Sequence, residues 1–284
     1  MTGPTLVVLA AGRSTRYGAA KQLEIVGPAG AMLIDYAIHD ARRAGFARVV
    51  LIVRPDLERA IRESVGVRWS ARVALAYAMQ DRPLGTAHAV LAARSVLDGP
   101  FAVINGDDFY GAASFQAIGD CLREMDAAPT YALVTFALRD TLPENGTVNR
   151  AIVDASPEGW VVDVREAVGI ERAGRDARFV DDRGRHPLAG DTPVSMNMWG
   201  FTPAVFLQLE TAFEDFRARG ARGTPAEFLL PNVVGDLVRR RAARVRAIPA
   251  RGRWRGLTRR SDLPAVRSLI EELTAAGEYP ERFD

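Results

Sequence analysis

The chain has 284 residues, 48% of them hydrophobic and 25% charged, with 37 basic against 35 acidic residues and a formal net charge of +2. So even a balance gives no reason to expect a nucleic acid or a membrane as partner, and no apolar run approaches the roughly 20 residues that span a bilayer. Cys121 is the sole cysteine, which excludes a disulfide within the chain and favours a reducing, cytoplasmic compartment.

Apolar runs and helical spacings alternate through the first half of the chain. Helical stretches at 32–43 and 88–97 separate strand-like runs at 6–9, 49–53, 73–77 and 101–104. This alternation is typical of strand–helix–strand units. It predicts an α/β protein with a Rossmann-like, mostly parallel mixed sheet and helices on both faces.

The second half is organised differently. Loops separate further strand-like runs at 131–138, 150–154, 160–164 and 194–201, which predicts added strands beside the parallel core. The stretch 171–191 is rich in Gly, Arg and Asp and is expected to be a flexible loop. Helix starts are expected at Thr202 and Thr224, with Pro231 breaking the second helix into two pieces, and a last helix is expected at 263–276.

The segment LAAGRSTRYGAAKQ follows the first strand and combines small residues, hydroxyl donors and two cations. These residues are Ala10, Ala11, Gly12, Ser14, Thr15, Arg16 and Lys21, the last being the only lysine of the chain. Small residues let backbone amides approach a ligand, so this is the composition of a polyphosphate cradle. The dinucleotide fingerprint and the Walker A pattern both fail here, because Ser14 replaces the second glycine and no Ser or Thr follows Lys21.

The same segment resembles the signature of the sugar-1-phosphate nucleotidyltransferases, or nucleoside diphospho-sugar pyrophosphorylases, which open with L-x-x-G-x-G/S-T-R and a lysine a few residues on. The resemblance implies the nucleotide-diphospho-sugar transferase fold in one domain over 1–284. Its nucleotide-binding half would be 1–128, its sugar-binding half 129–250 and its C-terminal helical segment 251–284. The implied substrates are a nucleoside triphosphate and a phosphorylated small-molecule acceptor, and the implied cofactor is Mg²⁺.

Two further segments resemble the nucleotide side of this family. In QDRPLGTAHAV, Gln80 would face the Watson–Crick edge of the base, and Gly85 with Thr86 would pack beside base and ribose. INGDDFYG resembles the strand end whose aspartate, here Asp107, binds magnesium. The resemblance also implies roles in the first loop. Backbone amides would hold the triphosphate, Arg16 would neutralise the departing pyrophosphate, and Lys21 would bridge the α-phosphate and the incoming phosphate.

Three segments resemble the sugar side. ENGTVNRAIV matches the glycine turn that meets the sugar, at Gly146. WVVDVREA has Glu166 where the family binds sugar hydroxyls, and VSMNMWGF has Asn197 on the strand near the sugar.

Adjacent carboxylates at Asp107 and Asp108 end a buried apolar strand, where they would repel each other unless a cation compensates. Consecutive side chains of a strand point to opposite faces, so only one of the two can face a cleft. The motif position selects Asp107. A capping or loop-ordering role for both is the alternative.

Two departures from the family pattern affect the acceptor and the metal. Where the family often has a lysine after the sugar-binding glutamate, this chain has Ala167, so Arg165 or Arg172 would have to meet the sugar phosphate. Many members take a second metal ligand from a late W-x-D segment. The corresponding segment here is RWRGLT, with Arg255 at that place, which leaves one protein carboxylate plus phosphates and water, or an unusual acceptor.

Three functions therefore remain open on the sequence. The favoured one is transfer of a nucleoside monophosphate to a sugar 1-phosphate. The others are a cytidylyltransferase-like enzyme acting on a non-sugar phosphorylated acceptor, and a non-catalytic nucleotide-binding regulator. A glutamine amide can donate to one edge position of a base and accept at the next, which suits uracil and thymine, so Gln80 predicts UTP or dTTP as the nucleotide. The sequence does not predict the oligomeric state.

Overall fold

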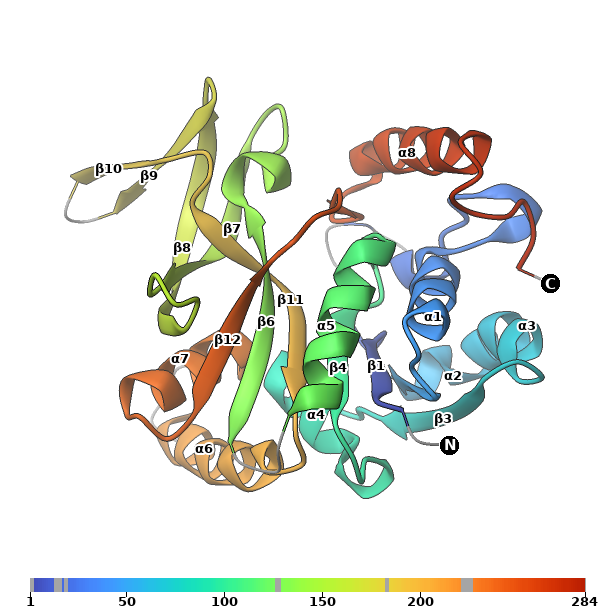
Figure 1. Cartoon of the computed structure of the whole chain (residues 1–284), viewed down its shortest axis with the longest axis horizontal. Helices are drawn as coiled ribbons and strands as arrows, with labels where there is room; N and C mark the ends of the chain where they lie inside the picture. The colour runs from blue at the N-terminus through green and yellow to red at the C-terminus, as the bar shows by residue number, and fades with distance from the viewer. Residues whose placement is uncertain are drawn as a thin grey trace.

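The computed structural model describes residues 3–12, 17, 20–125, 129–181, 184–220 and 227–283. Within these residues an 11-stranded mixed sheet forms the centre of the molecule, in the order β10-β9-β8-β7-β11-β4-β1-β2-β3, with β6 pairing β11 and β12 (Figure 1). The first half supplies four parallel strands, β1 (Thr5–Leu9), β2 (Arg48–Val53), β3 (Ala74–Met79) and β4 (Phe101–Asn105).

Helices cover both faces of this parallel part. They are α1 (Leu33–Arg43), α2 (Pro55–Ile61), α3 (Val67–Trp69), α4 (Thr86–Ala92) and α5 (Ala112–Glu124), with a π-turn at Arg62–Gly66. Strand β1 is buried on both sides, because Leu6 and Val8 lie in one hydrophobic cluster while Val7 and Leu9 lie in the other. A continuous apolar run is what a doubly covered parallel strand requires. The predicted fold class is confirmed.

The second half adds antiparallel and mixed strands. These are β6 (Thr130–Ala137), β7 (Thr147–Ala155), β8 (Val161–Ala173), β9 (Asp176–Asp181), β10 (Gly184–Leu188), β11 (Pro193–Phe201) and β12 (Arg244–Pro249). The flexible loop expected at 171–191 is wrong, since β8, β9 and β10 pair there in antiparallel register. Most of β9 and β10 is exposed or half-exposed, so no apolar alternation marked them as strands.

Three later helices complete the chain, α6 (Val205–Gly220), α7 (Leu230–Arg239) and α8 (Leu263–Ala275). The expected break at Pro231 is wrong, because this proline lies in the first turn of α7, where a missing N–H costs nothing. The helix start expected at Thr224 lies outside the described residues. The stretch expected to be helical at 88–97 is α4 followed by a short 3₁₀ turn, Arg94–Val96.

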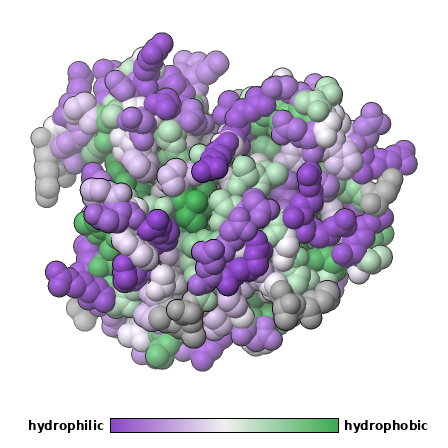
Figure 2. All heavy atoms as spheres, in the orientation of Figure 1, coloured by the Kyte–Doolittle hydropathy of each residue, from purple (hydrophilic) through white to green (hydrophobic). Residues whose placement is uncertain are grey.

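Short elements connect and cross these parts. They are β5 (Asp108–Phe109), β13 (Arg255–Gly256), and 3₁₀ turns at Lys21–Leu23, Pro28–Gly30, Leu138–Thr141 and Arg260–Asp262. Helix α8 lies beside α1 on the N-terminal half (Figure 1). Tyr279, which follows α8, packs on Tyr36 with ring centroids 5.1 Å apart. Figure 2 shows polar side chains over most of one face, with a notch at the upper edge between β7–β10 and α8.

The carboxyl ends of β3, β2, β1 and β4 meet at one edge of the sheet, because these strands are neighbours and parallel. At this edge the turn after β4 passes close to β1, where the Gly106 amide donates to the Leu9 carbonyl at 3.0 Å. A Cβ on Gly106 would lie 3.1 Å from a Val8 methyl, so glycine permits the approach. Asp107 is thereby brought next to the end of β1.

No helix in the described part of the chain is long and apolar enough to cross a membrane.

Candidate active site

Two side chains hold the start of the first loop by hydrogen bonds to the Gly12 carbonyl. The Gly12 carbonyl accepts hydrogen bonds from Gln22 Nε2 at 3.1 Å and from Arg54 Nη1 at 2.7 Å. Ala10 and Ala11 are buried, and the Ala10 amide donates to the Ile52 carbonyl at 2.8 Å, so it is not free to meet a ligand. The remaining predicted residues of this loop, Ser14, Thr15 and Arg16, lie outside the described residues.

Lys21 and Asp107 form an ion pair at the centre of this edge. Lys21 begins the 3₁₀ turn after the loop, and Asp107 follows Gly106 at the end of β4. Their side chains are 17% and 16% exposed, so both retain contact with solvent. The two groups that the sequence singled out as catalytic are therefore neighbours in space.

Asp108 points away from this pair into the protein. Its side chain is buried, and its Oδ2 accepts from Asn105 Nδ2 at 2.8 Å and from the Tyr110 hydroxyl at 3.2 Å. Burial raises the pKa of Asp108 and the nearby charge of Asp107 raises it further, while Lys21 and Arg150 oppose the shift. Only one of the two adjacent carboxylates reaches Lys21 and solvent, as strand geometry requires.

The late C-terminal segment crosses behind this strand end. Strand β13 pairs antiparallel with β5, and Gly256 is opposite Asp108. A Cβ on Gly256 would overlap the Asp108 carboxylate, so no side chain fits there. Arg255 was expected at the place of the second metal ligand, but this is wrong, because counting from Trp254 puts the aspartate of W-x-D at Gly256. Arg255 itself lies opposite Phe109 and donates to the Asp140 and Trp254 carbonyls. In the described residues no cluster of three or more His, Cys, Asp or Glu could hold a metal.

Gln80 follows β3 at the same edge and is almost fully buried. Its Nε2 donates to the Gly85 carbonyl at 3.1 Å and lies 3.1 Å from Nδ1 of His88. Both amide hydrogens are thus directed at the protein. The expectation that Gln80 donates to one position of the base and accepts at the next is wrong in its first part, because only Oε1 remains to meet a base.

The segment before α7 packs against Gly85 and forms hydrogen bonds with the start of α4. Gly85 has a φ of +122°, and a Cβ there would overlap the Phe228 backbone. The Ala87 amide donates to the Phe228 carbonyl at 3.0 Å, and the Leu230 amide donates to the Thr86 hydroxyl at 3.0 Å. This hydroxyl therefore orders the start of α7 as well as standing near the predicted base site.

Glu166, one of the residues predicted for the sugar side, shares a face of the mixed sheet with Ala151 and Ser195. Ser195 pairs with Ala151 across β11 and β7, and Ala151 pairs with Glu166 across β7 and β8. Directly paired residues share a face, and neighbouring strands are about 4.8 Å apart. Glu166 and Ser195 thus stand roughly 10 Å apart over the small Ala151 side chain. Glu166 is exposed, whereas Ala151 and Ser195 are buried.

Asn197 borders this face and connects it to the catalytic strand. It lies in a bulge of β11 with a φ of +61°. Its Nδ2 donates to Asn105 Oδ1 at 3.4 Å, and its Oδ1 accepts from Trp199 Nε1 at 3.2 Å. Asn197 therefore lies between the end of β4 and the acceptor face. Gly146 occupies an exposed turn with a φ of +88°, and a Cβ there would lie 3.5 Å from an Arg259 nitrogen.

The two arginines proposed for the sugar phosphate are engaged elsewhere. Arg172 donates to the Leu142 carbonyl at 2.8 Å and to the Arg139 carbonyl at 2.9 Å, so it braces a loop. Arg165 lies 3.6 Å from Asp154. A third arginine, Arg150, lies near the buried Asp108: its charge opposes the rise in the pKa of that carboxyl, and burial lowers the pKa of Arg150 to about 10.

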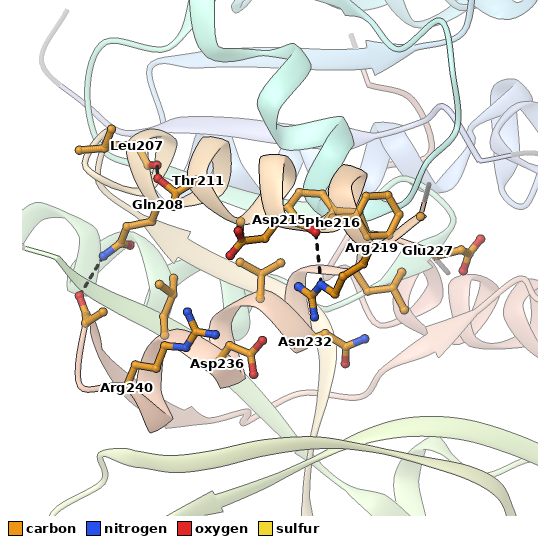
Figure 3. A pocket seen from close by; sticks show the side chains of 17 residues that line it. Leu207, Gln208, Thr211, Asp215, Phe216, Arg219, Glu227, Asn232, Asp236 and Arg240 are labelled. Carbon is orange, nitrogen blue, oxygen red and sulfur yellow. Dashed lines mark hydrogen bonds between the residues drawn. The ribbon is translucent and has the colours of Figure 1, made fainter. Parts of the chain in front are cut away.

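A separate cavity of about 640 Å³ lies between α6 and α7 (Figure 3). Phe216 from α6 lines it together with Asn232 from α7, and charged residues such as Asp215 and Arg240 also contribute. None of the predicted site residues lines this cavity. Lys21 and Asp107, the described residues that were predicted to be catalytic, lie instead at the sheet edge.

Sequence reasoning missed three residues of the site, Arg54, Asn105 and His88. Arg54 directly follows β2, and Asn105 is the last residue of β4. Ligands of parallel sheets bind beyond the carboxyl ends of the strands, so these positions could have been predicted from the strand ends. His88 stands in the same sequence segment as Gln80, but no motif assigns a role to it.

A small-residue loop, a lysine and a strand-end aspartate at the carboxyl edge of a parallel sheet define a nucleotide-binding α/β enzyme. The model of the nucleotidyl transferase family matches residues 6–149, and the chain belongs to this family. The resemblance seen in the sequence is confirmed.

Curated relatives include the bifunctional protein GlmU of Symbiobacterium thermophilum, 32% identical over 184 residues that cover 62% of this chain and 36% of that protein. GlmU of Azorhizobium caulinodans is 39% identical over 95 residues, or 34% of this chain and 20% of that protein. The chain therefore spans about a third or less of the length of these relatives.

Two solved structures share the fold. A protein from Bacillus anthracis assigned as a glucose-1-phosphate thymidylyltransferase aligns with a TM-score of 0.67 and 12% identity, covering 94% of this chain and 95% of that one. The inositol-1-phosphate CTP transferase from T. maritima aligns with a TM-score of 0.64 and 16% identity, covering 95% and 97%.

Proposed function

We propose that this nucleotidyltransferase transfers a nucleoside monophosphate from a nucleoside triphosphate to a sugar 1-phosphate, releasing pyrophosphate. The name of one fold neighbour, glucose-1-phosphate thymidylyltransferase, describes this kind of transfer. A single sheet runs through the nucleotide half, 1–128, and the sugar half, 129–250, which supports one domain over 1–284 together with the segment 251–284.

The observation that carries the proposal is the ion pair of Lys21 and Asp107 between two prepared surfaces. On one side are the first loop and Gln80, which suit a nucleotide. On the other is the face with Glu166, whose carboxylate can accept hydrogen bonds from hydroxyl groups. A group transferred between two substrates must pass where both surfaces meet. The hydrogen bond of Asn197 to Asn105, at the end of the strand that precedes Asp107, supports a meeting point beside the pair.

The reaction needs alignment and charge rather than a protein nucleophile. An oxygen of the acceptor phosphate attacks the α-phosphorus, the new P–O bond forms opposite the bond to pyrophosphate, and that bond breaks with its electrons leaving on pyrophosphate. Lys21 holds the attacking phosphate and the α-phosphate together and stabilises the charge that develops on the α-phosphate oxygens. Arg16 neutralises the pyrophosphate, and Glu166 and Asn197 orient the acceptor, with Gly146 at its turn.

The residues present suit magnesium. Mg²⁺ is usually held by one or two carboxylates plus substrate phosphates and water. Asp107 offers a partly exposed carboxylate, and Gly256 contributes no side chain, so Asp107 would hold the ion with the triphosphate supplying the other ligands. Bound there, Mg²⁺ would offset negative charge on the triphosphate.

The test is a screen of UTP, dTTP, CTP, ATP and GTP against sugar 1-phosphates and polyol phosphates, read as magnesium-dependent pyrophosphate release. We expect release only when a triphosphate and a sugar 1-phosphate are both present. Pyrophosphate release with a triphosphate and a polyol phosphate, but not with any sugar 1-phosphate, would mean that the acceptor is not a sugar. Triphosphate binding without release on any acceptor would contradict catalysis and favour a regulator.

A further inference from the structure

The side-chain amide of Gln80 has a fixed orientation in this structure. The Gly85 carbonyl, 3.1 Å from Gln80 Nε2, can only accept a hydrogen bond, so the nitrogen and not the oxygen must face it. The second hydrogen of the same nitrogen faces His88 Nδ1, also at 3.1 Å. Reversing the amide would place an oxygen against the Gly85 carbonyl, which is unfavourable for buried groups. With the amide nitrogen fixed in this way, the contact with His88 requires Nδ1 to be the ring nitrogen that accepts.

His88 is itself held in place from behind. Its ring packs on Phe213 of α6 with centroids 5.2 Å apart. Phe213 in turn contacts Phe228, whose backbone clasps Gly85. The imidazole is therefore half-buried between α6 and Gln80, with Nδ1 toward the Gln80 amide.

Gln80 Oε1 is the polar atom of this amide that remains available to a ligand. No contact among the described residues supplies a donor to it, whereas both N–H groups have protein acceptors. Because Oε1 accepts hydrogen bonds and cannot donate them, it favours a base that presents a hydrogen-bond donor to it. Uracil and thymine offer the imide N3–H, while cytosine has a lone pair at the same ring position, where two acceptors would repel.

We infer that His88 is a specificity-determining positioning residue: it holds Gln80 as an acceptor for the imide N–H of uracil or thymine and thereby disfavours cytosine. The inference rests on the proposed function only in taking Gln80 to face the base. His88 acts through Gln80 and does not contact the reacting phosphates.

The experiment measures the dissociation constants of UTP and CTP, the two triphosphates that differ only at this edge. His88→Phe removes the Nδ1 acceptor and keeps a ring against Phe213. His88→Asn supplies an amide oxygen near the position of Nδ1. Phe213→Leu is the matched control, because it replaces the ring behind His88 by another apolar side chain and keeps the Nδ1 acceptor itself.

We expect the wild type to bind UTP more tightly than CTP and His88→Phe to lose about tenfold of this preference, which corresponds to roughly one hydrogen bond. His88→Asn should recover the wild-type ratio to within about threefold, and Phe213→Leu should retain it. A purely structural role of His88 would weaken both nucleotides alike and leave the ratio unchanged.

Three results would overturn the inference: an unchanged ratio in His88→Phe, no recovery in His88→Asn, or tighter binding of CTP by the wild type. Binding is measured without an acceptor, so a failure of this inference is separate from a failure of turnover with sugar 1-phosphates. If no triphosphate binds, the proposed function fails and this inference fails with it.

Discussion

The nucleotide side and the acceptor side of the site are built in different ways. On the nucleotide side, the functional groups already contact one another: Lys21 pairs with Asp107, and Gln80 is held by Gly85 and His88. On the acceptor side, Glu166 is exposed on a strand and Gly146 lies in an exposed turn. The nucleotide side is preorganised by its own contacts, and the acceptor side is positioned by sheet register.

This difference indicates where catalysis and where acceptor recognition reside. Preorganised charges stabilise a transition state without reorganising during the reaction. Exposed groups on a strand can bind a substrate, but each adds only a hydrogen bond or two. Substitutions on the nucleotide side should therefore lower kcat strongly, and substitutions on the acceptor side should mainly raise the KM of the acceptor.

The largest effect is expected for Asp107→Asn. The change is nearly isosteric but removes the charge that pairs with Lys21 and would hold magnesium, so kcat should fall about 10³-fold with the fold intact. Asp108→Asn is the matched control, because this neighbouring carboxylate is buried and points away from the cleft. Steady-state kinetics over a magnesium titration would measure both. An equal loss in the two variants would contradict the assignment of Asp107.

Lys21→Arg should lower kcat roughly 10²-fold while nucleotide affinity stays within a few-fold. An ammonium is compact, whereas a planar guanidinium is wider and binds a carboxylate through two parallel hydrogen bonds. An arginine at this position should therefore form a bidentate contact with Asp107 and displace the reacting phosphates from their in-line arrangement. A variant with near-normal kcat would mean that the only lysine of the chain is a surface cation that has no catalytic role.

A smaller effect is expected for Glu166→Gln, which should raise the acceptor KM about tenfold and leave the nucleotide KM unchanged. The neutral amide keeps the shape of the side chain but accepts hydrogen bonds from hydroxyl groups less strongly. Glu171→Gln is the control on the same strand, because Glu171 pairs with Arg178 instead. A change in nucleotide KM of the same size would place Glu166 on the nucleotide side.

The smallest effect on turnover is expected from Asp40, which lies behind the nucleotide side and accepts from the Tyr279 hydroxyl at 2.7 Å. Burial raises the pKa of Asp40 to about 7. Between about pH 4 and 7 the unfolded chain has lost this proton and the folded chain keeps it, so the free energy of unfolding falls as pH rises through this window and then levels off.

Asp40→Asn removes this titration, and Tyr279→Phe removes only its hydrogen-bond partner. Denaturant unfolding at pH 5 and pH 8 should therefore show a smaller pH dependence in Asp40→Asn than in the wild type, with kcat retained. The same pH dependence in both proteins would contradict the buried, protonated state of Asp40.

The sequence predicted the nucleotide side more completely than the acceptor side, for a physical reason. Lys21 and Asp107 belong to short, dense motifs at the ends of strands, and parallel topology brings such ends together. The row of Ser195, Ala151 and Glu166 depends on register between distant strands, which a resemblance could suggest and no local pattern could supply.

The errors have equally local causes. Strands β9 and β10 expose so many of their residues that no alternation identifies them, and they were expected to be loop. Pro231 suits the first turn of a helix as well as a break within one, so its position could not be decided without the start of α7. His88 has no motif of its own, and its contact with Gln80 follows from the turn at Gly85.

The central claim is that an acceptor phosphate oxygen attacks the α-phosphorus beside Lys21. The most direct test is ³¹P NMR of the reaction between UTP and a sugar 1-phosphate whose phosphate oxygens carry ¹⁸O. We predict one equivalent of pyrophosphate and a nucleoside diphosphate sugar with ¹⁸O in the bridge between its two phosphorus atoms. Formation of UMP, or a diphosphate product without ¹⁸O in the bridge, would contradict the account.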